Sequence, residues 1–148
     1  MTTLPAEGTL LVLSSPMGVP LYSARGLTQT LKPIPQAADL RRDINGNLVD
    51  LSVAGFRKYA SSIQCKDVEA PALDGIWPGQ ILTVSCVAEL SYLTAGGAAQ
   101  RTAVSGSSYV SGAFTYYRPQ LTMRVMSFQS SDAEWPNEVS WMLELEEI

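Results

Sequence analysis

Apolar residues recur at every second position of this chain, and that period most limits the folds open to it. The alternation of apolar and polar residues runs from Tyr59 to Asp67, from Leu82 to Tyr92 and from Val139 to Glu146. Successive side chains of a strand point to opposite faces, so a period of two predicts strands with one apolar and one wet face. No segment shows the period of about 3.6 residues that marks an amphipathic helix. We therefore predict an all-β protein.

The length of the chain limits how these strands are arranged. Its 148 residues are enough for one domain and too few for two. About seven or eight strands fit between the turn signals, and each sheet must cover its apolar face. We predict a single domain over residues 1–148, folded as an antiparallel β-sandwich or a compact barrel.

A tight hairpin is expected at Asn45-Gly46, which stands between Ile44 and Leu48. Asn-Gly readily takes the positive φ angles that a type I′ turn requires of both central residues. The pair therefore predicts a two-residue turn between two short strands.

The segment from Thr94 to Gly112 differs from the rest of the chain. Gly, Ala, Ser and Thr dominate it, and its one charged residue is Arg101. Two interpretations stay open. The segment is either a flexible loop or a long Gly/Ser-rich hairpin arm that orders only against a partner, as coupled folding allows.

Composition argues against most catalytic and metal sites. The chain has no histidine, which removes Ser-His and Cys-His nucleophile pairs and every His-based metal site. Cys65 and Cys86 occupy positions on the apolar faces of their predicted strands, so we expect both to lie in the core. They could form a disulfide only if their strands are neighbours. Carboxylates near turns, such as Asp43 and Asp50, offer only the pairs that any acidic protein has by chance. We expect no enzymatic activity, no cofactor and no metal.

Charge is sparse and unevenly spread. Charged residues make up 16% of the chain and the net charge is −4. Residues 20–66 have seven basic and three acidic side chains, a net charge of +4, whereas residues 67–148 have three basic and ten acidic ones, a net charge of −7. The negative total argues against direct nucleic-acid binding. The asymmetry would let a basic face of one copy dock on an acidic face of another.

Membrane and secretion signals are not found in the sequence. No stretch approaches the roughly 18 apolar residues of a membrane-spanning helix. Residues 1–8 lack the basic start and the apolar run of a signal peptide, so we expect synthesis in a reducing cytoplasm.

Seven residues are candidate interface positions. Neighbouring tyrosines on a strand point to opposite faces, so one faces the core and the other faces solvent or a partner, and tyrosine and arginine are common in binding hot spots. Basic and acidic side chains from the two halves of the chain complete the set. The candidates are Arg41, Arg42, Arg101, Tyr116, Tyr117, Glu144 and Glu146.

Five stretches carry a likeness to a known class of proteins: RRDINGNLVDLS (residues 41–52), FRKYASSIQCKD (56–67), APALDGIWPGQ (70–80), FTYYRPQLTMRV (114–125) and VSWMLELEEI (139–148). Together they span the last three quarters of the chain and resemble small virion structural proteins of tailed bacteriophages. The resemblance implies a non-enzymatic, β-rich subunit of the virion, made in the bacterial host cytoplasm. Its implied partners are other virion proteins and copies of itself.

Within that class, a tail accessory or baseplate/fibre-attachment component fits first, and a capsid decoration (cement) protein second. A soluble cytosolic binding module is the main alternative from another class, and an enzyme is the third. The size of the protein in solution and its appearance in negative stain would separate these hypotheses.

Overall fold

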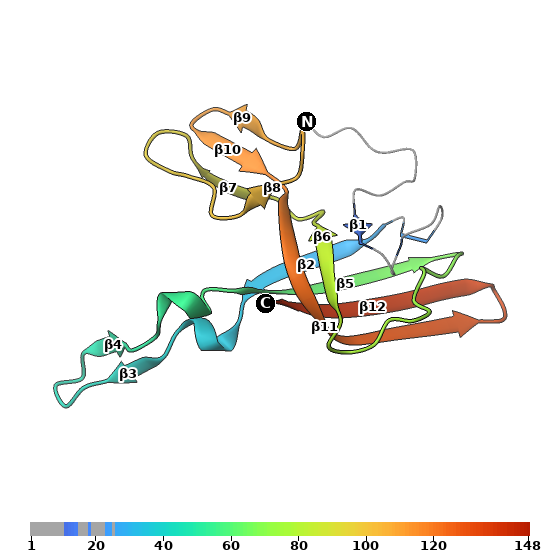
Figure 1. Ribbon diagram of the computed structural model, residues 1–148, viewed down its shortest axis with the longest axis horizontal. Coiled ribbons are helices and arrows are strands. Elements are labelled where there is room, and N and C mark those ends of the chain that lie inside the picture. The colour runs from blue at the N-terminus through green and yellow to red at the C-terminus, as the bar shows by residue number, and fades with distance from the viewer. Residues whose placement is uncertain (1–10, 15–17, 19–22, 25) are drawn as a thin grey trace.

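The computed structural model describes residues 11–14, 18, 23–24 and 26–148, and antiparallel strands dominate it (Figure 1). The all-β prediction is confirmed. The helical elements in this part of the chain are two short 3-10 turns, η1 (Pro35–Ala37) and η2 (Ala54–Phe56).

Seven strands form the main sheet, in the order β1-β6-β11-β12-β5-β2, with β8 also paired to β11. Their bounds are β1 (Val12–Leu13), β2 (Thr28–Pro33), β5 (Tyr59–Asp67), β6 (Ile81–Ser85), β8 (Thr102–Ala103), β11 (Pro119–Ala133) and β12 (Glu138–Glu147).

The main sheet curls along its longest strand, β11. Residues 120–124 of β11 pair with β6, and residues 123–133 pair with β12. The register with β12 shifts between Val125 and Ser127, and an extra residue at such a bulge bends a strand and increases its twist. In Figure 1, β6 and the adjoining part of β11 cross the direction of β5 and β12 steeply.

The side chain of Gln29 joins the last strand of this curled sheet to the segment that follows β6, near the other end of the strand order. Gln29 lies on β2, the last strand in the order, and its Oε1 accepts hydrogen bonds from the N–H groups of Val87 (2.7 Å) and Ala88 (3.3 Å), just after β6. Its Nε2 donates to Ser61 Oγ on β5 (3.0 Å). The sheet therefore resembles a half-open barrel.

The apolar core lies inside this curve. The indole N–H of Trp141 donates to the backbone carbonyl of Ser23 (2.8 Å), which satisfies the one polar atom of that side chain. Among the most deeply buried residues are Ile63, Ile76, Leu82, Val84, Leu121, Met123, Val125, Leu143 and Leu145.

Cys65 and Cys86 belong to this core, as predicted. They are 7% and 0% exposed, and both carry thiols. Cys65 lies on β5, and Cys86 directly follows β6. Because β11 and β12 separate those two strands in the sheet, the condition for a disulfide between neighbouring strands is not met.

Two smaller sheets extend from the main one (Figure 1). The first contains β7 (Leu90–Leu93), β10 (Phe114–Tyr117) and β9 (Tyr109–Ser111). The second is the hairpin of β3 (Leu40–Arg42) and β4 (Leu48–Asp50).

The single strand predicted from Leu82 to Tyr92 is wrong in one respect, because the structure divides it into β6 and β7. The N–H of Cys86 donates to the carbonyl of Pro119, and Gln29 accepts the next two N–H groups. Backbone bonds to distant parts of the chain therefore interrupt the strand.

A long Gly/Ser-rich hairpin arm at residues 94–112 is not confirmed. Within this segment β8 pairs with β11, and β9 pairs with β10. The segment is divided between two sheets of the molecule.

The hairpin predicted around Asn45-Gly46 forms, but its turn is not type I′. The N–H of Gly46 donates to the carbonyl of Asp43 (3.0 Å), so Ile44 and Asn45 are the central residues of the turn. Gly46 follows them with a φ of +82°, and Asn45 is not among the residues with positive φ. This is a three-residue connection with glycine in the left-handed region.

Candidate interaction surfaces

The hairpin β3–β4 projects from the molecule, and we call residues 39–51 the arm. Figure 1 shows it beyond η1 and η2, directed away from the main sheet. All six strand residues of the arm are exposed. An isolated two-stranded hairpin is at best marginally stable in water, so a feature of this kind needs either internal polar bonds or a partner.

Large apolar side chains cover the arm. Leu40 is 56% exposed, Leu48 55% and Leu51 61%, and Ile44 at the turn is 100% exposed. Apolar side chains gathered on one projecting element commonly mark a surface that another molecule covers.

Hydrogen bonds to carboxylates keep the turn of the arm in shape. Oδ1 of Asp43 accepts from the N–H groups of Asn45 and Asn47 (2.9 Å each). These bonds, that from Asn47 first, hold the pKa of the Asp43 carboxyl below its ordinary value. Hydrogen bonds from the hydroxyl and N–H of Ser52 similarly lower the pKa of Asp50. The Asp43 carboxylate therefore favours a type I turn closed by glycine, and the Asp50 carboxylate holds the other end of the hairpin.

Each face of the arm has one arginine and one aspartate, but within the described chain only one of the two arginines is in an ion pair. Arg42 lies opposite Leu48, and Leu40 lies opposite Asp50, so these four share one face. Arg41 is on the other face, where its Nε donates to Asp39 Oδ1 (3.0 Å). Arg42 donates to the carbonyl of Gly46 (3.0 Å) and has no ion pair among the described residues.

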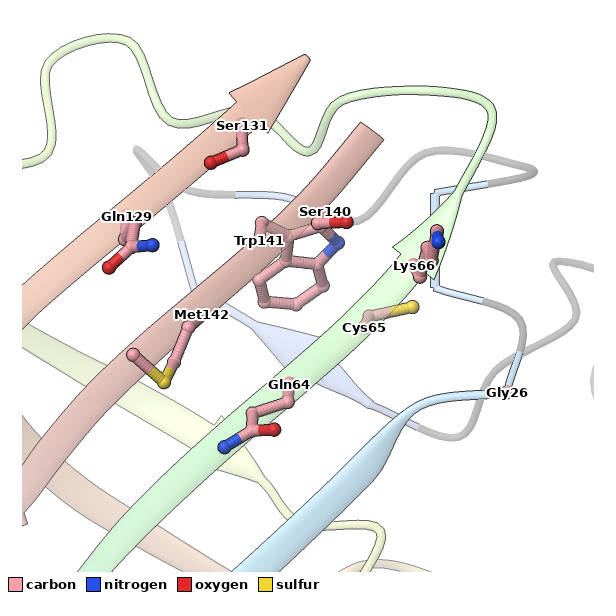
Figure 2. Close-up of a pocket in the computed structure, with 9 residues that line it drawn as sticks. All are labelled: Gly26, Gln64, Cys65, Lys66, Gln129, Ser131, Ser140, Trp141 and Met142. Atoms are coloured by element: carbon pink, nitrogen blue, oxygen red, sulfur yellow. The ribbon is translucent and has the colours of Figure 1, made fainter. Parts of the chain in front are cut away.

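The outer face of the main sheet, opposite the core, is the second surface. Along β12 the core side chains alternate with outward Ser140, Met142, Glu144 and Glu146. Figure 2 shows one part of this surface, where Gln129, Met142 and Gln64 stand in a row across β11, β12 and β5. They help to line a hollow of about 400 Å³.

A second hollow on this sheet, of about 420 Å³, contains both predicted glutamates. We call it the acidic trough. Ser127 Oγ donates to Glu144 Oε2 (3.1 Å), and Met126, at the bulge of β11, is 49% exposed. Its lining residues are Thr30, Lys32, Ala60, Ser61, Ser62, Met126, Glu144, Leu145 and Glu146.

The tyrosine pair divides as the alternation predicts. Tyr117 is 3% exposed and packs edge-on against Tyr92, with ring centroids 6.1 Å apart. Tyr116 is half-buried and stacks on Tyr109 at 5.3 Å. Tyr117 is therefore a core residue and is not accessible to a partner, which leaves Tyr116 as the surface candidate.

Arg101 binds within its own chain. Its guanidinium donates to both carboxylate oxygens of Glu147 (2.8 and 3.1 Å) and to the carbonyl of Arg57 (2.8 Å), and it lies 5.2 Å above the ring of Tyr59. These bonds fix the 94–112 segment to the end of β12. Within the described chain Arg101 is a structural clamp, and its part in an interface stays a prediction.

Several titratable groups have pKa values shifted away from neutral pH. Burial raises the pKa of the Cys86 thiol to about 11 and also raises that of Cys65. A hydrogen bond to Glu89 raises the pKa of Tyr109. Among the described residues, no group of three or more Cys, Asp and Glu side chains is placed to hold a metal ion.

Comparisons with known proteins give no relative. No family model matches the chain, and neither curated proteins nor solved structures include a match to it. No helix in the described part of the chain is long and apolar enough to cross a membrane.

Proposed function

We propose that this chain is a non-enzymatic structural subunit that assembles in multiple copies through its arm. The sequence resemblance favours a virion component of a tailed bacteriophage, either a tail accessory or baseplate/fibre-attachment protein or a capsid decoration protein. In either place in the particle, a small subunit would have much of its surface covered by other proteins.

The projecting arm is the observation that carries this proposal. Ile44, Leu48 and Leu51 are all more than half exposed, so the described part of the chain does not bury them. Burying one such side chain contributes roughly 1.5–3 kcal/mol. Covering the arm with a partner would therefore stabilise an association and the hairpin itself.

A second copy of the same chain is the occupant that charge favours. Arg42 is exposed on the arm, and Glu144 and Glu146 lie on the outer face of the main sheet. The opposite charges of Arg42 and of these two glutamates allow repeated copies to dock on one another, in a closed ring or in an open array.

Sedimentation velocity over a range of concentrations tests the proposal. We expect the unchanged protein to form a defined multimer that dissociates as salt is raised, because charge steers the contact. The double variant Ile44→Asp/Leu48→Asp should be monomeric with an unchanged circular dichroism spectrum.

A matched control makes the same change elsewhere. Leu93→Asp/Val110→Asp replaces two apolar side chains that are also more than half exposed, on β7 and β9 outside the arm, and should assemble normally. An unchanged protein that stays monomeric at high concentration and shows no particles in negative stain would contradict the proposal and favour a soluble binding module.

A further inference from the structure

We propose that the Leu40–Arg42–Leu48 face of one arm docks in the acidic trough of a second copy. This inference rests on the proposed function and assigns the surface that receives the arm. Three features support this contact: the charges on each surface that have no ion pair in the described chain, the apolar groups beside them, and the direction of the arm.

One arginine and two glutamates are the charged side chains that would meet in this contact. Along β12, Glu138 pairs with Lys66 (2.9 Å) and Glu147 pairs with Arg101 (2.8 Å). Glu144 and Glu146 have no ion pair among the residues described by the structure, although Lys32 helps to line the same trough. Arg124 lies opposite Glu146 in the register of β11 and β12, and its guanidinium donates to the carbonyl of Gly79 (2.6 Å).

On the arm, the carboxylates are engaged locally. Asp43 and Asp50 accept hydrogen bonds from backbone N–H groups, and Asp39 pairs with Arg41. Arg42 is the arm cation that lacks a carboxylate in the described chain. A guanidinium meeting two carboxylates gives short, charge-assisted hydrogen bonds, which fix register as well as orientation.

Apolar groups accompany the charges on both surfaces. Leu40 and Leu48 are on the same face as Arg42, and Met126 is half exposed at the edge of the trough. Methionine is unbranched and flexible, so it adapts to side chains of different shape. The docked arm would bury leucine against Met126 while Arg42 contacts the glutamates.

The direction of the arm assigns this contact to another copy. The arm extends away from its own main sheet (Figure 1), so its tip is remote from the trough of the same chain. Two copies could exchange arms reciprocally, or successive copies could dock head to tail, and the mass of the complex distinguishes these forms.

Charge reversal with mixing tests the assignment. Arg42→Glu places a carboxylate on the arm face that would meet the acidic trough, and Glu144→Lys/Glu146→Lys places two ammonium groups in the trough where they would meet Arg42. Each variant alone should associate at least about tenfold more weakly than the unchanged protein, because like charges then meet. An equimolar mixture should regain assembly, with the two variants in a 1:1 ratio by native mass spectrometry.

Two controls match these variants. Arg41→Glu reverses a charge on the other face of the arm, and Asp132→Lys/Glu134→Lys reverses two charges at the opposite end of the β11–β12 hairpin. Both should assemble like the unchanged protein. The neutral variants Arg42→Gln and Glu144→Gln/Glu146→Gln, checked by circular dichroism, should also weaken assembly, by less than the reversals, because they remove the attraction without adding repulsion.

The results separate this inference from the proposed function. If the unchanged protein assembles, Ile44→Asp/Leu48→Asp abolishes assembly and the charge reversals have no effect, the trough is not the receiving surface although the arm remains the contact. If each reversed variant is monomeric and the mixture is monomeric too, the arm-to-trough pairing is wrong. If the unchanged protein itself is monomeric, the proposed function fails.

Discussion

Gly46 sets the conformation of the arm at the scale of one residue. Its φ of +82° lies in the region that residues with a side chain adopt only at a cost. A Cβ there would meet no atom within 4 Å, so the cost of substitution comes from backbone conformation and not from crowding.

Replacing Gly46 with valine should therefore loosen the arm alone. We expect a loss of about 1–2 kcal/mol in the local stability of the hairpin, seen as roughly tenfold faster hydrogen exchange at the amides of Asp43 and Leu51. Gly46→Asn is the control, because asparagine tolerates positive φ better. Unchanged exchange in the valine variant would show that the arm does not depend on this turn.

The two thiols give a second test at this scale. Burial raises the pKa of Cys86 to about 11, so little reactive thiolate exists at pH 8. Native Cys86 should react with a thiol reagent at least about 100-fold more slowly than in denaturant, with Cys65 intermediate, and both rates should rise with pH. Rapid labelling of both in the native protein would contradict their place in the core.

Arg101 connects the residue scale to the scale of whole elements. Its side chain is 21% exposed and that of Glu147 is 11% exposed, and the guanidinium also reaches the carbonyl of Arg57. Partly buried, charge-assisted bonds of this kind are stronger than an exposed ion pair.

We expect Arg101→Ala to lower the free energy of unfolding by about 1–3 kcal/mol, measured by urea denaturation. Arg101→Lys should recover only part of this loss, since an ammonium cannot contact both oxygens in parallel as the guanidinium does. A loss equal to that of Arg41→Ala, an exposed pair, would show that the clamp contributes nothing special.

The sequence predicts some elements of this fold closely. The strand read from Tyr59 to Asp67 coincides with β5, and β12 covers the alternation that starts at Val139. These strands lie in the middle of the main sheet, with one face on the core and one in water, so burial produces a clear period of two.

Other elements depend on contacts that local sequence does not record. The break between β6 and β7 is due to Gln29, 58 residues away from Val87. The turn at Asp43 follows from side-chain bonds that compete with the intrinsic preference of Asn-Gly.

The candidate site was only partly predictable for a similar reason. The alternation of apolar and polar residues placed Glu144 and Glu146 on the outer face of their strand, and the Asn-Gly pair placed Arg41 and Arg42 near a hairpin. That the hairpin projects could not be seen, because Leu40 and Leu48 are typical of a buried strand and only the tertiary arrangement shows that nothing in the described chain covers them. The Gly/Ser-rich composition of residues 94–112 indicated an arm where the structure has two short paired strands instead.

At the scale of the whole molecule, the arm is separate from the core. The core lies within the main sheet, whereas the arm forms a sheet of its own. The base of the arm is closed by the bond from the Ile34 N–H to the Lys58 carbonyl (3.0 Å), so the main sheet does not depend on residues 39–51 for its pairing.

Removal of the arm therefore gives the most direct test of the central claim. In this variant a short Gly/Ser linker replaces residues 39–51, and its sedimentation is compared with that of the unchanged protein at the same concentration and salt. We expect a folded monomer, with a thermal midpoint within a few degrees of the original, where the unchanged protein forms a multimer. A variant without the arm that still assembles to the same size would contradict it.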